Sequence, residues 1–360
     1  MKLLVFSPYF WPHKGGHEKY VQELCSRLAK NWKITIVTAQ LAGMKTEELF
    51  FGMRILRVPS WNILGETYPV PKPTIFKLLR QIPLPDVIIT NTRFFPLSAI
   101  AARFARKKKI PLLHIEHGTM HPPVRIFLRP LVLLYDHTIG KFVFKSATVV
   151  AGVSHAAEQF VKHVCNRTTT TLYNAIDTVF FHHKLASPRR PVITFVGRLI
   201  EAKGVQDLLE ATRDLAADVW IIGAGNFEQT LRKLAGKNVK FLGEKTPAQV
   251  RELLAQSTLF VNPSYNEGLP TSVLEAGSLG LPVIATDVGG TCEIIDDGVN
   301  GYLAKPHDAN ALRTLITSTL DNSACAFEQG KMLQKKIRTT FDWKTIAAQA
   351  DKLLRSLVKP

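Results

Sequence analysis

The stretch NPSYNEGLPTSVLEAGSLGLPVIATDVGG, residues 262–290, is the part of the chain that most clearly indicates its fold. The overlapping apolar run 258–264 has the β-branched and aromatic content of a buried strand, and Gly268 and Pro270 end it before a helical segment. A second strand-like run, 282–290, then completes a strand–helix–strand unit. The stretch therefore predicts an α/β sheet with a ligand site at the carboxyl end of a strand.

Two carboxylates flank the start of the predicted helix, Glu267 in the loop and Glu275 on the helix. A helix N-terminus offers free backbone N–H groups and a positive dipole end, so an anion such as a diphosphate can sit against Thr271 and Ser272. A carboxylate accepts hydrogen bonds from vicinal hydroxyls, so one glutamate could hold a hexose and the other a ribose. The alternative is a solvated helix face, but the position at a strand end favours a sugar-nucleotide site.

Strand and helix patterns alternate along the whole chain, which is typical of doubly wound α/β proteins. In the first half we predict strands at 2–10, 33–39, 85–91, 111–118 and 147–154, and helices at 17–30, 96–108 and 155–163. After a polar, proline-marked stretch at 182–191 the alternation resumes, with strands at 191–197 and 219–225 and helices at 203–217 and 226–235. A length of 360 residues also favours two domains. The boundaries predicted are 1–182, joined by a C-terminal helix at about 344–358, and 183–343.

Composition is that of a globular protein, with 46% hydrophobic and 21% charged residues. The four cysteines lie far apart and have neither metal-ligand nor redox spacing, which fits buried free thiols in a reducing compartment. The N-terminal MKLLVFSPYFWP lacks a small-residue cleavage site and is interpreted as a first strand, not a targeting segment. The apolar segment 124–144 carries too many charged and polar residues to favour a membrane span.

The charge is concentrated in the first half of the chain. Residues 1–185 have 25 Lys and Arg against 10 Asp and Glu, whereas residues 186–360 have 21 against 19. Such a surface meets nucleic acid or an anionic membrane. Within residues 124–145 the basic residues alternate with large apolar ones, and this mixture favours lipid headgroups over nucleic acid as the partner. The residues predicted to face the membrane and the acceptor are Arg125, Arg129, Lys141 and Lys145. A buried helix pair at 124–144, and a solvated helix end at the RKKK run 106–109, are the alternatives.

Three glycine and basic motifs could serve a phosphate group. Gly15 and Gly16 follow the first strand and precede a helix, so backbone can approach a phosphate there, although a plain turn explains them equally. Arg198 and Lys203 follow another strand and could both reach a diphosphate, the alternative being a surface helix start. The GAG at 223–225 is not a dinucleotide fingerprint, because Glu228 occupies the place of its third glycine.

In this order the motifs resemble those of the retaining glycosyltransferases of family 4, which have the GT-B fold. The matching segments are Gly15–Gly16, EHG at 116–118, YNAID at 173–177, GRLIEAKGV at 197–205, FLG at 241–243, the block from Glu267 to Glu275, ATDVGGTCEII at 286–295, DGVNGYL at 297–303 and the closing FDWKTIAAQADKLL at 341–354. The resemblance spans nearly the whole chain. It implies two Rossmann-like, doubly wound domains facing each other across a cleft, the second binding the nucleotide sugar and the first the acceptor.

The resemblance also implies roles for single residues. Glu267 is similar to the carboxylate that holds donor-sugar hydroxyls and Glu275 to the ribose ligand, while His117 corresponds to a histidine beside the donor sugar. The catalytic set implied is His117, Glu267, Arg198 and Lys203. The donor-binding set implied is Gly15, Gly16, Arg198, Lys203, Glu267, Gly268, Leu269, Thr271, Ser272 and Glu275. Two positions differ from the family pattern: Pro270 has no N–H to give a sugar, and Ala175 replaces a glycine.

The predicted activity is transfer of a hexose from a nucleotide sugar, UDP-linked or GDP-linked with UDP favoured, to a glycan or lipid-linked acceptor of cell-surface polysaccharide, lipopolysaccharide or glycolipid synthesis. No Asp-x-Asp pair is present to hold a divalent metal, so metal-independent catalysis without a cofactor is expected. The predicted location is cytoplasmic and peripheral, at the inner face of an anionic membrane, with no nucleic-acid partner. The alternatives are a GT-B-like NDP-sugar epimerase and a non-catalytic, membrane-adsorbed binding protein.

Overall fold

The computed structural model describes residues 1–13, 15–63, 68–121, 128–186 and 188–358. The chain forms two compact units, one of Met1–Tyr173 with Ile346–Pro360 and one of Asn174–Thr345. The division falls before the proline-marked stretch on which the predicted boundary rests. Residues just after Tyr173 already pack within the second unit, where Phe181 is buried and its carbonyl accepts a hydrogen bond of 3.1 Å from Ser278 Oγ.

The first unit contains an eight-stranded sheet in the order β10-β9-β8-β7-β1-β2-β4-β3, parallel except for β3. Its strands are β1 (Lys2–Phe6), β2 (Lys33–Ala39), β3 (Glu47–Phe50), β4 (Met53–Val58), β7 (Val87–Asn91), β8 (Leu112–Glu116), β9 (Val149–Gly152) and β10 (Thr170–Thr171). A separate antiparallel ribbon pairs β5 (Ser60–Ile63) with β6 (Tyr68–Pro71). The helices are α1 (Gly16–Leu28), α2 (Thr74–Gln81), α3 (Pro96–Lys108), α4 (Arg129–Tyr135), the π-helix η2 (Asp136–Gly140), α5 (Lys141–Ser146), α6 (His155–Cys165) and, from the chain's end, most of α14 (Trp343–Leu357).

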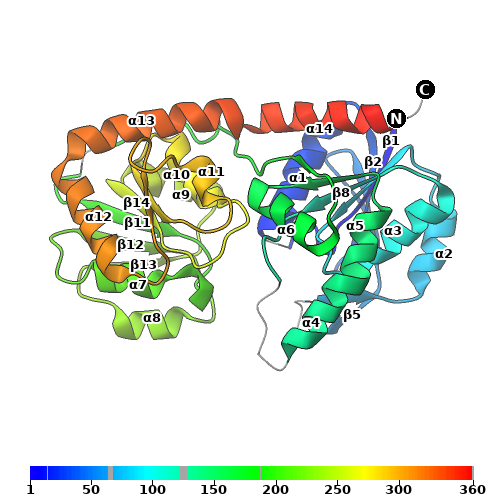
Figure 1. The fold of residues 1–360 in the computed structure, drawn as a ribbon, viewed down its shortest axis with the longest axis horizontal. Helices are drawn as coiled ribbons and strands as arrows, with labels where there is room; N and C mark the ends of the chain where they lie inside the picture. Colours follow the sequence, from blue (N-terminus) through cyan, green and yellow to red (C-terminus); the bar gives the residue numbers. More distant parts are fainter. Residues whose placement is uncertain (14, 64–67, 122–127, 187, 359–360) are drawn as a thin grey trace. The chain divides into compact units, whose positions relative to one another are not determined.

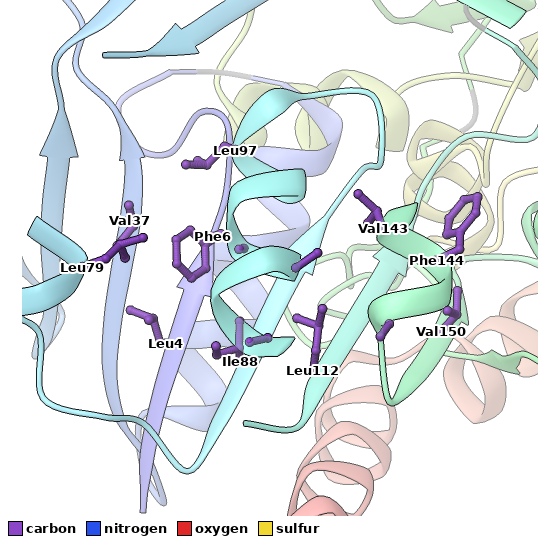
Figure 2. Close-up of a cluster of buried hydrophobic side chains, with 14 of the residues drawn as sticks. Leu4, Phe6, Val37, Leu79, Ile88, Leu97, Leu112, Val143, Phe144 and Val150 are labelled. Atoms are coloured by element: carbon purple, nitrogen blue, oxygen red, sulfur yellow. The ribbon is translucent and has the colours of Figure 1, made fainter. Parts of the chain in front are cut away.

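The core of this unit lies between the sheet and the layer of α2, α3, α5 and α6 (Figure 1). Figure 2 shows side chains of β1, β7 and β8, among them Phe6, Ile88 and Leu112, meeting side chains of the covering helices. These three are fully buried. Because helices cover the parallel strands on both faces, β7 and β8 are buried along their whole length and have no polar alternation.

The second unit contains a six-stranded, all-parallel sheet in the order β13-β12-β11-β14-β15-β16. Its strands are β11 (Val192–Val196), β12 (Asp218–Ile222), β13 (Val239–Gly243), β14 (Leu259–Asn262), β15 (Val283–Thr286) and β16 (Tyr302–Ala304). Its helices are the 3₁₀-helix η3 (Glu201–Lys203), α7 (Val205–Ala211), α8 (Glu228–Leu234), α9 (Pro247–Ala255), α10 (Thr271–Ser278), α11 (Thr291–Ile294), α12 (Ala309–Asp321), α13 (Ser323–Thr340) and the first residues of α14.

Each sheet has a point where the strand order reverses, and such a point is where doubly wound proteins bind ligands. It lies between β1 and β7 in the first unit and between β11 and β14 in the second. The loops that follow β11 and β14 therefore leave the same edge of the sheet as neighbours. This topology confirms the predicted fold class of two Rossmann-like domains.

The predicted elements correspond to observed ones, but one helix is shorter, and several elements were not predicted, among them β13, α9, β16, α12 and α13 of the second unit. Of the cysteines predicted to be buried, Cys25 is buried, whereas Cys292 and Cys325 are exposed. The helix predicted over 203–217 is shorter, since α7 ends at Ala211 and Asp214 adopts a left-handed backbone conformation (φ 64°) that no helix continues through. The region 47–81, with β3 to β6 and α2, was not predicted, because its strands are short and mostly antiparallel additions at the edge of the sheet or beyond it.

Candidate functional site

The centre of the candidate site is the loop between β14 and α10. The buried strand ends at Asn262, and the hydroxyl of Thr286 on β15 donates to the backbone oxygens of Asn262 (3.4 Å) and Ser264. Pro270 has an extended backbone and gives no side-chain cap to α10, which begins at Thr271. The structure thus provides a helix start without a side-chain cap from its N-cap residue, a geometry suited to an anion.

Glu267 lies in this loop beside two polar side chains. Its Oε1 accepts hydrogen bonds from Lys203 Nζ at 2.6 Å and from Asn262 Nδ2 at 3.4 Å. The Glu267 side chain is 10% exposed and that of Lys203 20% exposed, so the ion pair is partly shielded but reachable from solvent. Asn262 has no predicted role in the sequence analysis, and its position as the last residue of a buried strand is the signal that could have identified it.

Lys203 reaches Glu267 because the loops after β11 and β14 pack backbone against backbone. Gly204 has φ 63°, and a Cβ added there would lie 1.9 Å from the carbonyl oxygen of Pro263. The amide of Tyr265 also donates to the carbonyl of Ala202 at 2.9 Å. Only glycine satisfies both the positive φ and the close approach, so Gly204 fixes the distance between the two loops.

A third loop, after β15, fixes the backbone of Glu267. Gly289 has φ 57°, and a Cβ there would lie 1.7 Å from the Glu267 carbonyl oxygen. The next residue, Gly290, donates its N–H to the carbonyl oxygen of Gly268 at 3.0 Å. The segment DVGG therefore has a positioning role that the sequence analysis did not assign to it.

The remaining predicted residues of the second unit lie around this centre. Glu275 is 8% exposed on α10, four residues after Thr271, and Arg198 is exposed in the loop that follows β11. Leu269 is buried, and its carbonyl accepts a hydrogen bond of 3.4 Å from Asn174 Nδ2. The GAG at 223–225 packs against the loop that follows β11, since the N–H of Leu199 in that loop donates to the Ala224 carbonyl at 2.9 Å.

Gly15, Gly16 and His117 belong to the first unit. Gly15 is the N-cap of α1, where a Cβ would lie 2.1 Å from a carboxylate oxygen of Glu18, while the space around Gly16 is open. Burial alone would raise the pKa of Glu18, but a hydrogen bond from His13 and the charge of His17 hold it below its usual value. A buried carboxylate thus already lies at the first turn of α1.

His117 is half-buried, with the rings of Tyr20 and His17 as neighbours. Tyr20 approaches it edge-on, with 4.9 Å between ring centroids, and its Nε2 is buried without a hydrogen-bond partner among the described residues. Burial, reinforced by the neighbouring His17, lowers the pKa of His117 to about 3. The imidazole is therefore neutral at physiological pH and can exchange hydrogen bonds with a ligand without carrying charge.

Sequence reasoning missed a buried charge network in the first unit. Arg93 NH1 donates to Glu116 Oε1 at 3.0 Å, and its Nε and NH2 donate to the two oxygens of Asp136 at 2.9 and 3.0 Å. Asp136 also pairs with His121 Nδ1 at 2.6 Å. The side chains of Arg93, Glu116 and Asp136 are at most 2% exposed. No local spacing connects three residues so far apart in the sequence, so only the fold brings them together.

Of the predicted membrane-facing residues, Arg129 begins α4 and is exposed, Lys141 is half-buried and Lys145 is exposed on α5. Arg125 lies outside the described residues. Leu131 and Leu134 on α4 are 62% and 61% exposed, unlike the residues of a buried helix pair, whereas Val143 and Phe144 on α5 are fully buried. Within the described ranges, no helix is at once long enough and apolar enough to cross a bilayer.

Comparison with known proteins agrees with this architecture. Residues 14–180 match the family described as Glycosyltransferase Family 4, and residues 178–340 match the family described as Glycosyl transferases group 1. An uncharacterised glycosyltransferase of Methanocaldococcus jannaschii is 29% identical over 99% of both chains. The putative teichuronic acid biosynthesis glycosyltransferase TuaC of Bacillus subtilis is 29% identical over 74% of this chain and 70% of its own. HepE from Anabaena, solved in complex with UDP, matches with a TM-score of 0.82 and 20% identity over 99% of this chain and 100% of its own, which establishes the fold.

Fold and matches together define a glycosyltransferase with the GT-B fold. The chain belongs to glycosyltransferase family 4.

Proposed function

We propose that this glycosyltransferase moves a hexose from a nucleotide sugar to a glycan or lipid-linked acceptor, with retention of configuration at the sugar and without a metal ion. The observation that carries the proposal is the Glu267–Lys203 pair, 2.6 Å apart, beside the start of α10, with Glu275 on the same helix. One carboxylate precedes the N-terminus of α10 and the other lies on the helix, so an anion bound at that N-terminus has a carboxylate on either side. This arrangement fits a molecule with hydroxyls at both ends and phosphates between them.

The charges of the site fit the charges of the transfer reaction. When the bond between the sugar and the diphosphate breaks, negative charge grows on the leaving diphosphate. Lys203, Arg198 and the N–H groups at the start of α10 supply the compensating positive charge. Lys203 forms an ion pair with Glu267. A bound donor exchanges these partners, since its hydroxyls take Glu267 and its diphosphate takes Lys203.

Retention follows when the acceptor attacks from the face that the diphosphate leaves. The acceptor oxygen forms the new bond to the sugar carbon as the bond to the diphosphate oxygen breaks, and the acceptor's proton passes to the diphosphate. This route needs no enzyme carboxylate as nucleophile. Proton NMR of the product formed from an α-linked donor tests it, because inversion would give a β-linked product.

UDP is the favoured nucleotide. The SYNEGLP segment inclines toward a UDP-sugar, and the similarity to HepE, solved with UDP, supports the same choice. The similarity to TuaC supports a cell-surface polysaccharide as the product. A thermal-shift comparison of UDP, GDP and ADP tests the nucleotide: UDP should raise the melting temperature most, and a larger shift with GDP would replace UDP by GDP in the proposal.

The acceptor is expected to come from an anionic membrane surface, at its cytoplasmic face, through the first unit. Arg129 is exposed on α4 together with Leu131 and Leu134, and Lys145 is exposed on α5. Each basic residue near such a surface contributes about 1 kcal/mol, so binding should be reversible and weakened by salt. Liposome sedimentation of a variant with Arg125, Arg129, Lys141 and Lys145 changed to Ser tests this. Sedimentation equal to that of the wild type would indicate a soluble acceptor and a merely solvated basic face.

Two other activities remain as outcomes of simple tests. An epimerase would convert the nucleotide sugar without any acceptor, so incubation of the enzyme with donor alone would reveal it. A non-catalytic binding protein would bind the nucleotide sugar and membranes but leave the donor intact. Pro270, at the N-cap of α10, gives the donor sugar no N–H and should therefore influence which hexose is preferred.

A further inference from the structure

A hollow of about 440 Å³ in the first unit is lined by residues of α2 and α3. Its apolar part consists of Leu79 and Phe76 from α2 with Ile100 and Phe104 from α3. Leu79 is buried in the core, whereas Phe76 is 50% exposed at the opening. An aromatic ring half in water beside an aliphatic hollow costs free energy unless something apolar covers it.

The rest of the lining is cationic. Arg80 on α2 and Arg103, Lys107 and Lys108 on α3 line the hollow and are all exposed, and none of the described lining residues is acidic. Four like charges around one opening repel one another, so the arrangement favours an anion. The RKKK run, which alone indicates only a solvated helix end, therefore has two of its lysines at an apolar hollow.

The sequence around the hollow offers almost no carboxylate to neutralise it. Residues 67–115 contain nine Lys and Arg and one acidic residue, Asp86. The Oδ2 atom of Asp86 already accepts a hydrogen bond of 2.7 Å from the backbone N–H of Lys2. The positive field is thus left for a partner outside this stretch.

We propose that the hollow lined by α2 and α3 binds one anionic phospholipid of the membrane. Its phosphate lies among the four cations, and the first carbons of its acyl chains lie on Phe76, Leu79, Ile100 and Phe104. A volume of about 440 Å³ is within the range of small-molecule sites and larger than a phosphate ion requires. Leu79 and Ile100 are aliphatic and suit acyl carbons, whereas Phe76 and Phe104 could also stack on the bases of a single-stranded nucleic acid, which is the competing outcome of the test.

This site is separate from the residues of α4 and α5 proposed above to face the membrane, and it does not rest on the transfer reaction. α5 packs against α3 in the same layer of helices, so Lys141 and Lys145 belong to the layer that contains the hollow (Figure 1). The earlier residues would provide diffuse attraction. The hollow would hold one lipid by shape as well as by charge.

The RKKK run supplies a matched pair of variants for the test. Lys107→Gln/Lys108→Gln removes two charges that line the hollow, and Arg106→Gln/Lys109→Asn removes two from the same helix end that do not. Asn suits position 109 because its φ is 55°. Phe76→Ser removes the apolar lip without changing charge. Binding is measured by sedimentation with vesicles of phosphatidylglycerol and phosphatidylcholine at fixed ionic strength, and with single-stranded DNA for comparison.

We expect the Lys107/Lys108 variant to lose at least about fivefold more vesicle affinity than the Arg106/Lys109 variant, the loss typical of one charge near an anionic surface. Phe76→Ser should weaken vesicle binding and leave any binding of DNA unchanged. Equal losses of vesicle affinity in the two double variants would show that diffuse electrostatic attraction explains the binding, and would overturn the proposal. So would unchanged vesicle binding by Phe76→Ser, or DNA binding that is tighter than vesicle binding and lost in the Lys107/Lys108 variant.

Discussion

The two units each contain a cluster of opposite charges, and the clusters differ in how much they are shielded. In the first unit Arg93 is enclosed with Glu116 and Asp136, and its NH2 group also donates to the carbonyl oxygen of Met120. In the second, Lys203 and Glu267 form one partly exposed pair beside a helix start. Enclosed charges must be satisfied by the fold itself, whereas a partly exposed pair can exchange its partners for a ligand. We therefore expect the first cluster to stabilise the fold, and we propose that the second takes part in the transfer reaction.

The largest expected effect comes from removing the arginine of the buried network in the first unit. Arg93→Met removes the cation and leaves two buried carboxylates without it, so the first unit should lose about 3–5 kcal/mol of unfolding free energy. Arg198→Met, which removes an exposed arginine of the second unit, should change stability by no more than about 0.5 kcal/mol. Hydrogen exchange of peptides from β8 and β11 measures each unit separately. Unchanged protection of β8 in Arg93→Met would show that the network contributes little.

The same contrast explains what the sequence could predict. Residues 262–290 carry a strand, a turn, a helix start and two carboxylates within one short segment, so local chemistry was enough to predict them. The chain alternation likewise predicted both parallel sheets, because fully buried strands are continuous apolar runs. These features depend on residues that are close together in the sequence, so local patterns are sufficient to predict them.

The network of Arg93, Glu116 and Asp136 could not be predicted in this way. Arg93 follows β7, Glu116 ends β8, and Asp136 lies in a π-helix, which the sequence pattern did not predict. The positioning role of Gly289 was missed for the same reason. It depends on the folded loop, in which a Cβ added to Gly289 would lie 1.7 Å from the carbonyl oxygen of Glu267. Long-range approach of this kind is a property of the topology and is absent from any single segment.

The next effect tests the chemical end of the comparison. Arg198→Ala and Lys203→Ala should each lower kcat about 10²- to 10³-fold, the usual loss for one group that stabilises developing charge. Each should weaken donor binding much less. Lys237→Ala, an exposed lysine before β13, is the matched control and should leave kcat unchanged. Steady-state kinetics together with calorimetric donor binding separate the two quantities. Equal losses in kcat and in binding would mean that the pair serves the ground state alone.

A metal requirement is checked with the same assay. We expect EDTA to leave the wild-type rate intact, because Arg198, Lys203 and the start of α10 carry the positive charge that a metal would otherwise bring to the diphosphate. A rate lost with EDTA and restored by Mg²⁺ would contradict this assignment.

A smaller effect sharpens the role of α10. Glu275→Ala should weaken nucleotide binding by about 1–3 kcal/mol, because a ribose hydroxyl pair would lose its acceptor. Glu252→Ala, an exposed glutamate on α9, provides a control of equal charge change. Calorimetry with UDP and GDP measures both. Identical affinities for Glu275→Ala and the wild type would assign Glu275 to the packing of the helix and not to the ribose.

The smallest effect concerns pH and the half-buried His117. Its folded pKa is about 3, whereas a histidine in the unfolded chain titrates near 6.5. Between these values the unfolded chain binds more protons, so the unfolding free energy of the first unit should fall as the pH is lowered, by about 1–2 kcal/mol from pH 7 to pH 5. Glu18 and Glu116 act in the same direction, but their lowered pKa values confine them to pH below about 4.5. Hydrogen exchange of α1 and β8 peptides at the two pH values, corrected for intrinsic rates, should show the fall in the wild type and not in His117→Asn. An equal fall in both proteins would show that His117 takes up its proton in the folded state, and so could bring a positive charge to a ligand.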